Sequence, residues 1–443
     1  MNIQLSDHFT YSRLLRFVIP SIVMMIFTSI YSVVDGLFIS NFVGKTPFAA
    51  VNLIMPFAML LGGFGFMIGT GGSALVGKTL GEGDREKANQ IFSLLIYVSI
   101  GLGAVLAVFG IVFIKPISVL LGADEQMLGY CVVYCRILML ALPGFMLQNV
   151  FQSFLITAEK PAMGLVVTVI AGVTNMVLDA LFIAFFRWGV AGAAAATAIS
   201  QCVGGIVPFF YFLRKNDSLL QLTKTTFMGQ ALLRSCSNGM SELVSNISRS
   251  IVSMLYNLQL MKIAGESGVA AYGVIMYVNF IFIANFIGYS IGTAPIFSFH
   301  YGAENHLELK NVYRKSMKLN LAAGVVLTAV AMLLAAPLSK IFVGYDAELY
   351  AMTVRGFRLY SLSFLLCGFS IFGSAFFTAL NDGVVSAIIS FLRTVVFEVL
   401  SILILPMLLG LDGVWYSISV AEGAALIVTI YFFITKRKKY HYA

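Results

Sequence analysis

The chain has 443 residues, of which 59% are hydrophobic and 11% charged, whereas a soluble domain carries about 25% charged residues. Together with a mean hydropathy of +0.93, this composition excludes a soluble globular protein and indicates an integral membrane protein. The net charge of +8 is explained by basic loops at the membrane surface and requires no nucleic-acid partner.

Twelve apolar segments are long enough to cross a bilayer core of about 30 Å as helices, which takes about 20 residues each. We expect these helices at 14–42, 47–78, 90–114, 128–157, 162–186, 190–213, 230–262, 268–301, 315–336, 349–379, 384–408 and 413–435. A β-barrel would need short segments of strict alternation, which these runs lack. The expected fold class is an all-α membrane protein with twelve transmembrane helices.

The basic residues predict the orientation of these helices. Most of the 28 Lys and Arg residues fall on the side that holds the N-terminus, the loops after even-numbered helices and the tail "KRKKYHY". Because cytoplasmic loops carry an excess of Lys and Arg, we expect both termini to be cytoplasmic. The first residues, "MNIQLSDHFTYSRLLRF", include acids and lack a cleavage-site pattern, so we expect the first helix to be retained.

The sequence repeats itself after about 221 residues. "KPISVLLGADEQM" aligns with "APLSKIFVGYDAE", and "GVAGAAAATAISQ" aligns with "GLDGVWYSISVAE". Six helices per repeat is an even number, so the repeats share one orientation and are related by an axis along the membrane normal. We expect an N-lobe, residues 1–218 with helices 1–6, and a C-lobe, residues 219–443 with helices 7–12. Two such pseudo-symmetric lobes around a cavity are the architecture of alternating-access transporters.

Cysteine and histidine show no pattern typical of an enzyme or a metal centre. The five cysteines lie in or at the ends of predicted helices without metal-ligand spacing, and the four histidines occur singly. We therefore expect no catalytic residues, no enzyme activity and no cofactor.

Five carboxylates fall inside the predicted helices, where a charged side chain is costly and marks a functional site by default. They are Asp35, Asp179, Glu242, Glu398 and Glu422. Under the repeat, each acid aligns with a residue of the other half that is not acidic. The duplication kept the helices but not the acids, which indicates that the acids serve something other than the folding of a lobe.

Four segments in a fixed order resemble one known family. They are "DGLFISNFVG" in helix 1, "ALVGKTLGEGDREKANQIF" after helix 2, "NMVLDALFI" in helix 5 and "GVAGAAAATAISQ" opening helix 6. Each is weak alone, because glycine and alanine are abundant in membrane helices. Together, on a duplicated twelve-helix chain, they resemble the multidrug and toxic compound extrusion (MATE) family over nearly the whole sequence.

The resemblance implies a site in the N-lobe for H⁺ or Na⁺. Asn175 and Asp179 on helix 5 are four residues apart and share a face. The resemblance adds Asp35 of helix 1, Thr197 of helix 6 and Gln152 of helix 4, at a position often Asn in the family, which leaves the coordination of the ion open. A carboxylate in a dry pocket beside another carboxylate favours its neutral form, which suits proton exchange. The alternative is that Asp35 and Asp179 only brace the helices.

Helix 7 carries a second polar face, where Asn238, Glu242, Asn246 and Arg249 are spaced 4, 4 and 3 residues apart. Glu242 matches an acid that some branches of the resembled family use for cation coupling. The second acid expected in those branches, one turn on, is Asn246 here. We expect this face to line a substrate cavity, or Glu242 to pair structurally with Arg249.

Three further residues receive weaker predictions. Glu398 lies five residues after Arg393, which puts the two on different faces of an α-helix, and its role is left open. Glu422 is expected to be structural or to contact substrate. Pro20 lacks an N–H and is predicted to kink helix 1, fifteen residues before Asp35.

The function that these expectations favour is antiport, coupled to H⁺ or Na⁺, that exports amphipathic or cationic drugs and toxic organic compounds. The partners would be small organic molecules and the lipid bilayer, without an obligate protein partner, in the cytoplasmic (inner) membrane of a prokaryote. The alternative within the same superfamily is a flippase for lipid-linked oligosaccharides, which would use cavity cations such as Arg136, Arg249, Arg355, Arg358 and Arg393 to hold a pyrophosphate. A receptor or channel would not accumulate substrate against a gradient, and the duplicated lobes argue against it.

Overall fold

The computed structural model describes residues 3–443, and these residues contain helices and no strand. Residues 1 and 2 of the predicted N-lobe and N-terminal segment lie outside this range. The first half contains α1 (Tyr11–Phe38), η1 (Ile39–Val43), α2 (Lys45–Gly81), α3 (Arg85–Leu120), α4 (Glu125–Leu140), α5 (Leu142–Thr157), α6 (Pro161–Asp179), η2 (Ala180–Phe185) and α7 (Gly189–Leu213). The second half contains α8 (Gly229–Gly302), α9 (His306–Val343), α10 (Ala347–Ser361), α11 (Phe364–Ala379), α12 (Gly383–Phe391), η3 (Leu392–Phe397), α13 (Glu398–Leu409) and α14 (Leu411–Tyr440).

Twelve membrane crossings follow from these elements. Among the described residues, nine helices are long and apolar enough to cross a membrane, and two bent pairs, α4 with α5 and α10 with α11, add two more. The remaining crossing comes from α8, whose 74 residues include non-helical backbone at Gly265. An unbroken helix of that length would extend about 110 Å, so α8 supplies two crossings. The predicted all-α fold with twelve helices is confirmed.

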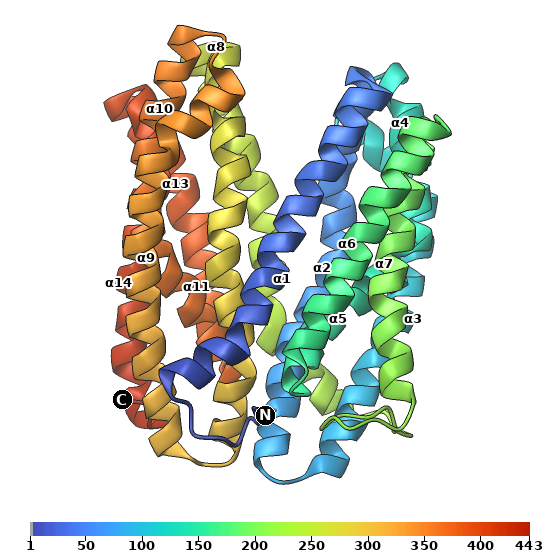
Figure 1. Cartoon of the computed structure of the whole chain (residues 1–443), viewed down its shortest axis with the longest axis vertical. Coiled ribbons are helices and arrows are strands. Elements are labelled where there is room, and N and C mark those ends of the chain that lie inside the picture. The colour runs from blue at the N-terminus through green and yellow to red at the C-terminus, as the bar shows by residue number, and fades with distance from the viewer. Residues whose placement is uncertain (1–2) are drawn as a thin grey trace.

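The helices form two bundles that lie together at the end holding both termini and diverge toward the other end (Figure 1). One bundle contains α2 to α7, the other contains α8 to α14, and α1 crosses diagonally between them. Large apolar side chains cover the outside, among them Leu333 and Ile341, each 77% exposed, and Met407, 85% exposed. Such a surface is stable in lipid rather than in water.

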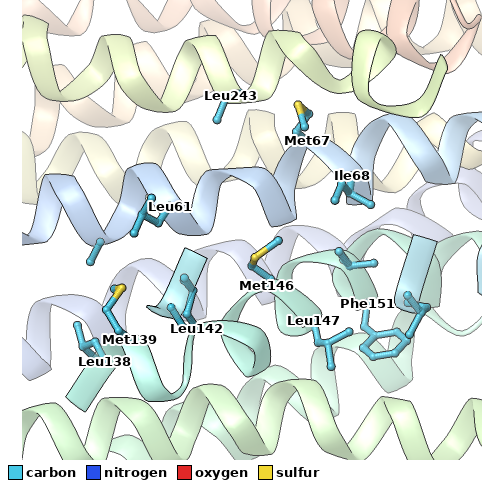
Figure 2. Close-up of a cluster of buried hydrophobic side chains, with 14 of the residues drawn as sticks. Leu61, Met67, Ile68, Leu138, Met139, Leu142, Met146, Leu147, Phe151 and Leu243 are labelled. Atoms are coloured by element: carbon cyan, nitrogen blue, oxygen red, sulfur yellow. The ribbon is translucent and has the colours of Figure 1, made fainter. Parts of the chain in front are cut away.

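Each bundle has its own packed interior. In the first, Ile68 of α2 lies on the side of Met146 and Phe151 of α5, whereas Met67 lies on the opposite side of α2, near Leu243 of α8 (Figure 2). Small residues let these helices approach, because bilayer packing gains little from hydrophobicity alone. A Cβ atom on Gly65 of α2 would lie 2.8 Å from the Cα atom of Met146.

The two bundles contact each other through helix backbone. A Cβ atom on Gly71 of α2 would lie 2.0 Å from the carbonyl oxygen of Ser235, and one on Gly239 of α8 would lie 1.9 Å from that of Met67. Near the end of α2, a Cβ atom on Gly81 would lie 2.0 Å from the carbonyl oxygen of Phe299. Glycine is therefore required here by close approach, and α2 and α8 form the main interface between the bundles.

Candidate functional site

The first bundle brings together four of the residues predicted for an ion site. Asp35 comes from α1, Asn175 and Asp179 from the last turns of α6, and Thr197 from α7. Asp35 and Asp179 interact electrostatically with each other. The Asn175 side chain lies 2% exposed, Asp179 is fully buried, and Asn175 Nδ2 donates a hydrogen bond of 3.5 Å to Thr197 Oγ1.

Small residues explain how these side chains meet. A Cβ atom on Gly172 of α6 would lie 2.5 Å from the Phe27 ring and 2.8 Å from the Tyr31 ring, so this glycine lets α1 lie close to α6. The alanine-rich face of α7, with Ala193, Ala194, Ala196 and Ala198 buried, lets that helix approach in the same way. The polar face of α6 is thus covered by two neighbours that each add one polar side chain.

The oxygen atoms of this site lack donors. Among the described residues, no donor lies within hydrogen-bond distance of Asp35 Oδ1, Asn175 Oδ1 or either carboxylate oxygen of Asp179, and all four atoms are buried. Unpaired buried oxygen atoms are costly unless a proton or a cation accompanies them. A set of carboxylate and amide oxygens fits H⁺ or a hard cation such as Na⁺.

Sequence reasoning missed three neighbours of this site. Tyr134 of α4, fully buried, interacts with Asp35, Asp179 and Thr197. Tyr31 of α1 interacts with Asp35 and with Gln148 of α5. Tyrosine and glutamine in apolar helices give no signal of their own in the sequence, because both are ordinary core residues there.

Gln152, the residue predicted on helix 4, lies one turn after Gln148. Both side chains line a cavity of about 10 Å³, roughly the volume accessible to one water molecule, together with Thr168 of α6 and Gly204 of α7. Among the described residues, no hydrogen bond joins Gln152 to the carboxylate pair. The part of Gln152 in ion binding stays a prediction.

The second bundle holds the other three acids and two arginines. Arg393 Nε donates to both carboxylate oxygens of Glu422, at 2.8 and 3.0 Å, and Arg393 Nη2 donates to Glu422 Oε1 at 2.6 Å. Glu422 is 2% exposed, so this ion pair joins η3 to α14 inside the bundle. Glu398 interacts with both members of the pair.

A π-helix explains why Glu398 lies near Arg393. The five-residue spacing puts the two side chains on different faces of an α-helix, but η3 covers Leu392–Phe397. In a π-helix the backbone hydrogen bonds run from residue i to i+5, so residues five apart lie closer to one face than they do in an α-helix. The sequence analysis did not foresee this interaction, because it assumed an uninterrupted α-helix.

The polar face predicted on helix 7 divides into two parts in α8. Asn238 Nδ2 donates to the Thr378 carbonyl oxygen at 2.8 Å and is buried between α8 and α11. Asn246 Nδ2 donates to the carbonyl oxygen of Glu242 at 2.8 Å. Glu242 interacts electrostatically with Arg249 and Arg393, while no ion pair within 4.0 Å joins Glu242 to Arg249 among the described residues. The cluster therefore holds three carboxyl groups and two guanidinium groups, so its acids outnumber its bases by one.

The fold and these two intramembrane sites define a class, that of a multi-pass membrane transporter built from two lobes. The family model MatE matches the chain twice, over residues 20–181 and 243–404. The chain belongs to this family, whose members are transporters and not enzymes.

Named relatives match nearly the whole length of the chain. A multidrug export protein MepA of Staphylococcus saprophyticus is 24% identical over 93% of this chain and 91% of that protein. A protein of the same name from Staphylococcus haemolyticus is 24% identical over 97% of this chain and 94% of that protein. The family, its role in efflux transport and its membrane setting are therefore established.

Solved structures agree in fold. A MATE transporter crystallised in complex with MaL6 superposes with a TM-score of 0.92 at 24% identity, covering 97% of both chains. An outward-facing MATE family transporter of the MOP superfamily superposes with a TM-score of 0.91 at 24% identity, covering 97% of this chain and 96% of that one. At this identity the likeness concerns the fold alone.

Proposed function

We propose that this protein is an antiporter that exports amphipathic or cationic organic compounds in exchange for H⁺ or Na⁺. The observation that carries the proposal is the pair of interacting carboxylates, Asp35 and Asp179, whose buried oxygen atoms lack donors. The names of the staphylococcal relatives, multidrug export proteins, support drug-like substrates.

In the proposed mechanism the coupling ion binds at Asp35 and Asp179, with Asn175 and Thr197 supplying neutral oxygen atoms. Binding neutralises one charge in a dry pocket, where an unneutralised pair of carboxylates is strongly unfavourable. The lobes then rock about the interface between α2 and α8. An ion that moves inward gains about 2.3 kcal/mol per charge per 100 mV, so one or two ions can drive export against a modest gradient. Pro20 lies on α1 between its start and Asp35, and bending there is the proposed link to the ionisation of Asp35.

The proposed orientation has both termini in the cytoplasm, in the inner membrane of a prokaryote, with lobe boundaries at residues 1–218 and 219–443. The basic loops and tail support it. In that orientation, the bundles diverge toward the outside (Figure 1), as expected for a state ready to release drug and receive the ion.

The substrate region that we propose lies near the charge cluster of the second lobe. In this cluster the three glutamates outnumber the two arginines, and a carboxyl group that ionises when an organic cation enters would neutralise the charge of that cation. Asn246, on the same face of α8 as Glu242, is a proposed contact, and Asn238 is proposed as a buried support of that face.

A flippase for lipid-linked oligosaccharides is the second candidate. It would need unpaired cations to hold a pyrophosphate. Arg393 pairs with Glu422 and Arg355 pairs with Asp412, so two of the five arginines that would serve it are already neutralised. This pairing favours drug export over the flippase.

The test is ethidium efflux from proteoliposomes under separately imposed proton and sodium gradients. We expect one gradient to drive efflux, and Asp35→Asn and Asp179→Asn each to reduce the driven rate at least tenfold. Glu86→Gln removes an exposed charge at the start of α3 and should leave the rate unchanged. Unaltered driven efflux in Asp35→Asn would remove the mechanism. Binding of a lipid pyrophosphate without dye transport would decide for the flippase.

A further inference from the structure

The segment before α1, residues 3–10, runs across the end of the molecule that holds both termini, and we call it the N-terminal strap. Its Leu5 N–H donates to Glu159 Oε1 at 2.5 Å, in the connection between α5 and α6 of the first lobe. Its Phe9 N–H donates to Glu308 Oε1 at 2.8 Å, in the first turn of α9 in the second lobe. One short segment is therefore bonded to a carboxylate of each lobe.

The end of the strap at Glu308 is held by several bonds. His8 Nδ1 lies 2.6 Å from Glu308 Oε2. The carbonyl oxygen of Phe9 accepts from Asn311 Nδ2 at 3.1 Å and from Lys315 Nζ at 2.6 Å. Hydrogen bonds to charged groups are the strong ones, and Glu308 is only 7% exposed.

Apolar contacts bury the strap as well. Leu5 and Phe9 are both 0% exposed, and the Phe9 ring meets Phe17 and His300 edge-on, with centroids 6.0 and 6.3 Å apart. The strap belongs to one apolar cluster with the start of α1 and with residues of the second lobe such as Leu309. The cluster also includes Ile156 of α5, and the Phe9 end of the strap packs against the second lobe at His300 and Leu309.

The end at Glu159 is different, because one hydrogen bond, beside the apolar burial of Leu5, joins it to the first lobe. Burial raises the pKa of Glu159, and the Leu5 N–H and the neighbouring Lys160 oppose that rise. Glu159 Oε1 accepts the hydrogen bond from the Leu5 N–H only while the strap lies over it. If the lobes separate at this end, the Leu5 to Glu159 bond breaks first and the strap moves with the second lobe.

We propose that the N-terminal strap is a latch between the lobes, anchored at Glu308 and released at Glu159, which holds this end closed while the other end is open. The inference rests on the proposed function in one respect, because it requires that the two lobes rock against each other. None of the strap residues touches the carboxylate pair or the charge cluster of the second lobe. The latch therefore sets the balance between the states with this end closed and open, and leaves ion binding itself unchanged.

The test measures the separation of the lobes directly. Spin labels are placed at two exposed positions of opposite lobes, Glu86→Cys on α3 and Arg314→Cys on α9, in the full chain with its five native cysteines replaced. The distance between labels is recorded in lipid nanodiscs by double electron–electron resonance. We expect one short distance to dominate in the parent, and Glu308→Leu and Glu159→Leu each to raise the population at longer distance at least fivefold.

Glu304→Gln is the matched control, since it removes a carboxylate four residues before Glu308 that makes no side-chain hydrogen bond or ion pair among the described residues. It should leave the distance distribution unchanged. Hydrogen exchange of residues 5–9 reports the bonds themselves and should accelerate at least tenfold in Glu308→Leu. A distribution unchanged in either leucine variant, when that variant is monodisperse and still binds ethidium, overturns the latch. Loss of ion-driven efflux in the parent would refute the proposed function without altering this result.

Discussion

At the scale of single residues, the acids are the signal that the sequence carries best. A carboxylate inside an apolar run is costly, so Asp35 and Asp179 could be singled out from the printed sequence, and the structure brings them together. Tyr134 and Gln148 could not be found in this way, because tyrosine and glutamine occur in any membrane helix. The strap was missed for another reason: Glu159 and Glu308 fall in loops or helix ends, where acids are expected to be solvated.

Arg393 and Glu422 allow a prediction about stability. Removing one member of a buried ion pair leaves the other charge unpaired, at a cost of about 3–5 kcal/mol, whereas replacing both by apolar residues of similar size is often nearly neutral. We expect Glu422→Leu to lower the melting temperature of the purified protein markedly, and the double change Arg393→Met with Glu422→Leu to recover most of the loss.

Thermal unfolding in one detergent, followed by tryptophan fluorescence, measures both variants. Lys160 and Asp217 supply the control pair, because Asp217 is exposed and Lys160 holds its pKa below the usual range. Asp217→Leu should change the melting temperature little. Equal melting temperatures for the single and double variants of the buried pair would contradict the expectation.

At the scale of helices, the two halves share a bend in one crossing that the sequence did not predict. The crossing at 128–157 was expected to be one helix, but it bends by 57° between α4 and α5, and its counterpart bends by 46° between α10 and α11. The bends fall at Ala141 and at Leu362–Ser363, about 221 residues apart. Pro143, in the first turn of α5, favours the first break, whereas the second break contains no proline.

The sequence analysis placed the starts of two helices too late, at 90 and 315, because it did not use capping residues, whereas α3 begins at Arg85 and α9 at His306. Asp84 accepts from the Lys87 N–H at the start of α3, and Asn305 accepts from the Glu308 N–H at the start of α9. These two caps are 221 residues apart. Such side chains satisfy the free N–H groups of a first turn, so the sequence itself marks where the two halves correspond.

The backbone conformation of Gly265 allows a prediction about the stability of α8. Gly265 has φ 61° and ψ −150°, a region that only glycine adopts without strain, and its counterpart Gly44 also has positive φ. No atom lies within 4 Å of a Cβ atom built on Gly265, so backbone strain alone sets the cost. We expect Gly265→Ala to destabilise the protein by about 1–3 kcal/mol.

Gly273 is the matched control for this change. It lies in the helical part of α8, and a Cβ atom there also meets open space. Gly273→Ala should be neutral or slightly stabilising, because alanine favours a helix by up to about 1 kcal/mol over glycine. The comparison is made by thermal unfolding of the two variants, and an equal effect in both would mean that the break at Gly265 is not held by its backbone conformation.

At the scale of the whole molecule, equivalent positions of the two repeats meet in a symmetric contact between the lobes. A Cβ atom on Gly81 would meet the carbonyl oxygen of Phe299, and one on Gly302 would meet that of Lys78, both at 2.0 Å. Gly81 and Gly302 are 221 residues apart, and so are Lys78 and Phe299. The contact is therefore of the self-complementary kind that two-fold symmetry produces, at the end where the strap joins the lobes.

Alanine at either glycine should force this end apart. Overpacking of a tight contact costs about 1–3 kcal/mol, which corresponds to a shift of about 5- to 150-fold in the equilibrium between the two states. The cost falls only on the state in which the lobes meet here, because the contact is absent once they separate. We therefore expect Gly81→Ala and Gly302→Ala to populate the longer distance between labels at positions 86 and 314.

Gly101→Ala separates this effect from a general response to alanine. Gly101 lies within α3, and a Cβ atom there meets no atom within 4 Å, so the distance distribution should be unchanged. Because the two contacts are equivalent by symmetry, Gly81→Ala and Gly302→Ala should act to a similar extent, and the double variant should open this end further. If Gly81→Ala and Gly101→Ala give the same distribution, backbone contact at this end does not set the balance between the states.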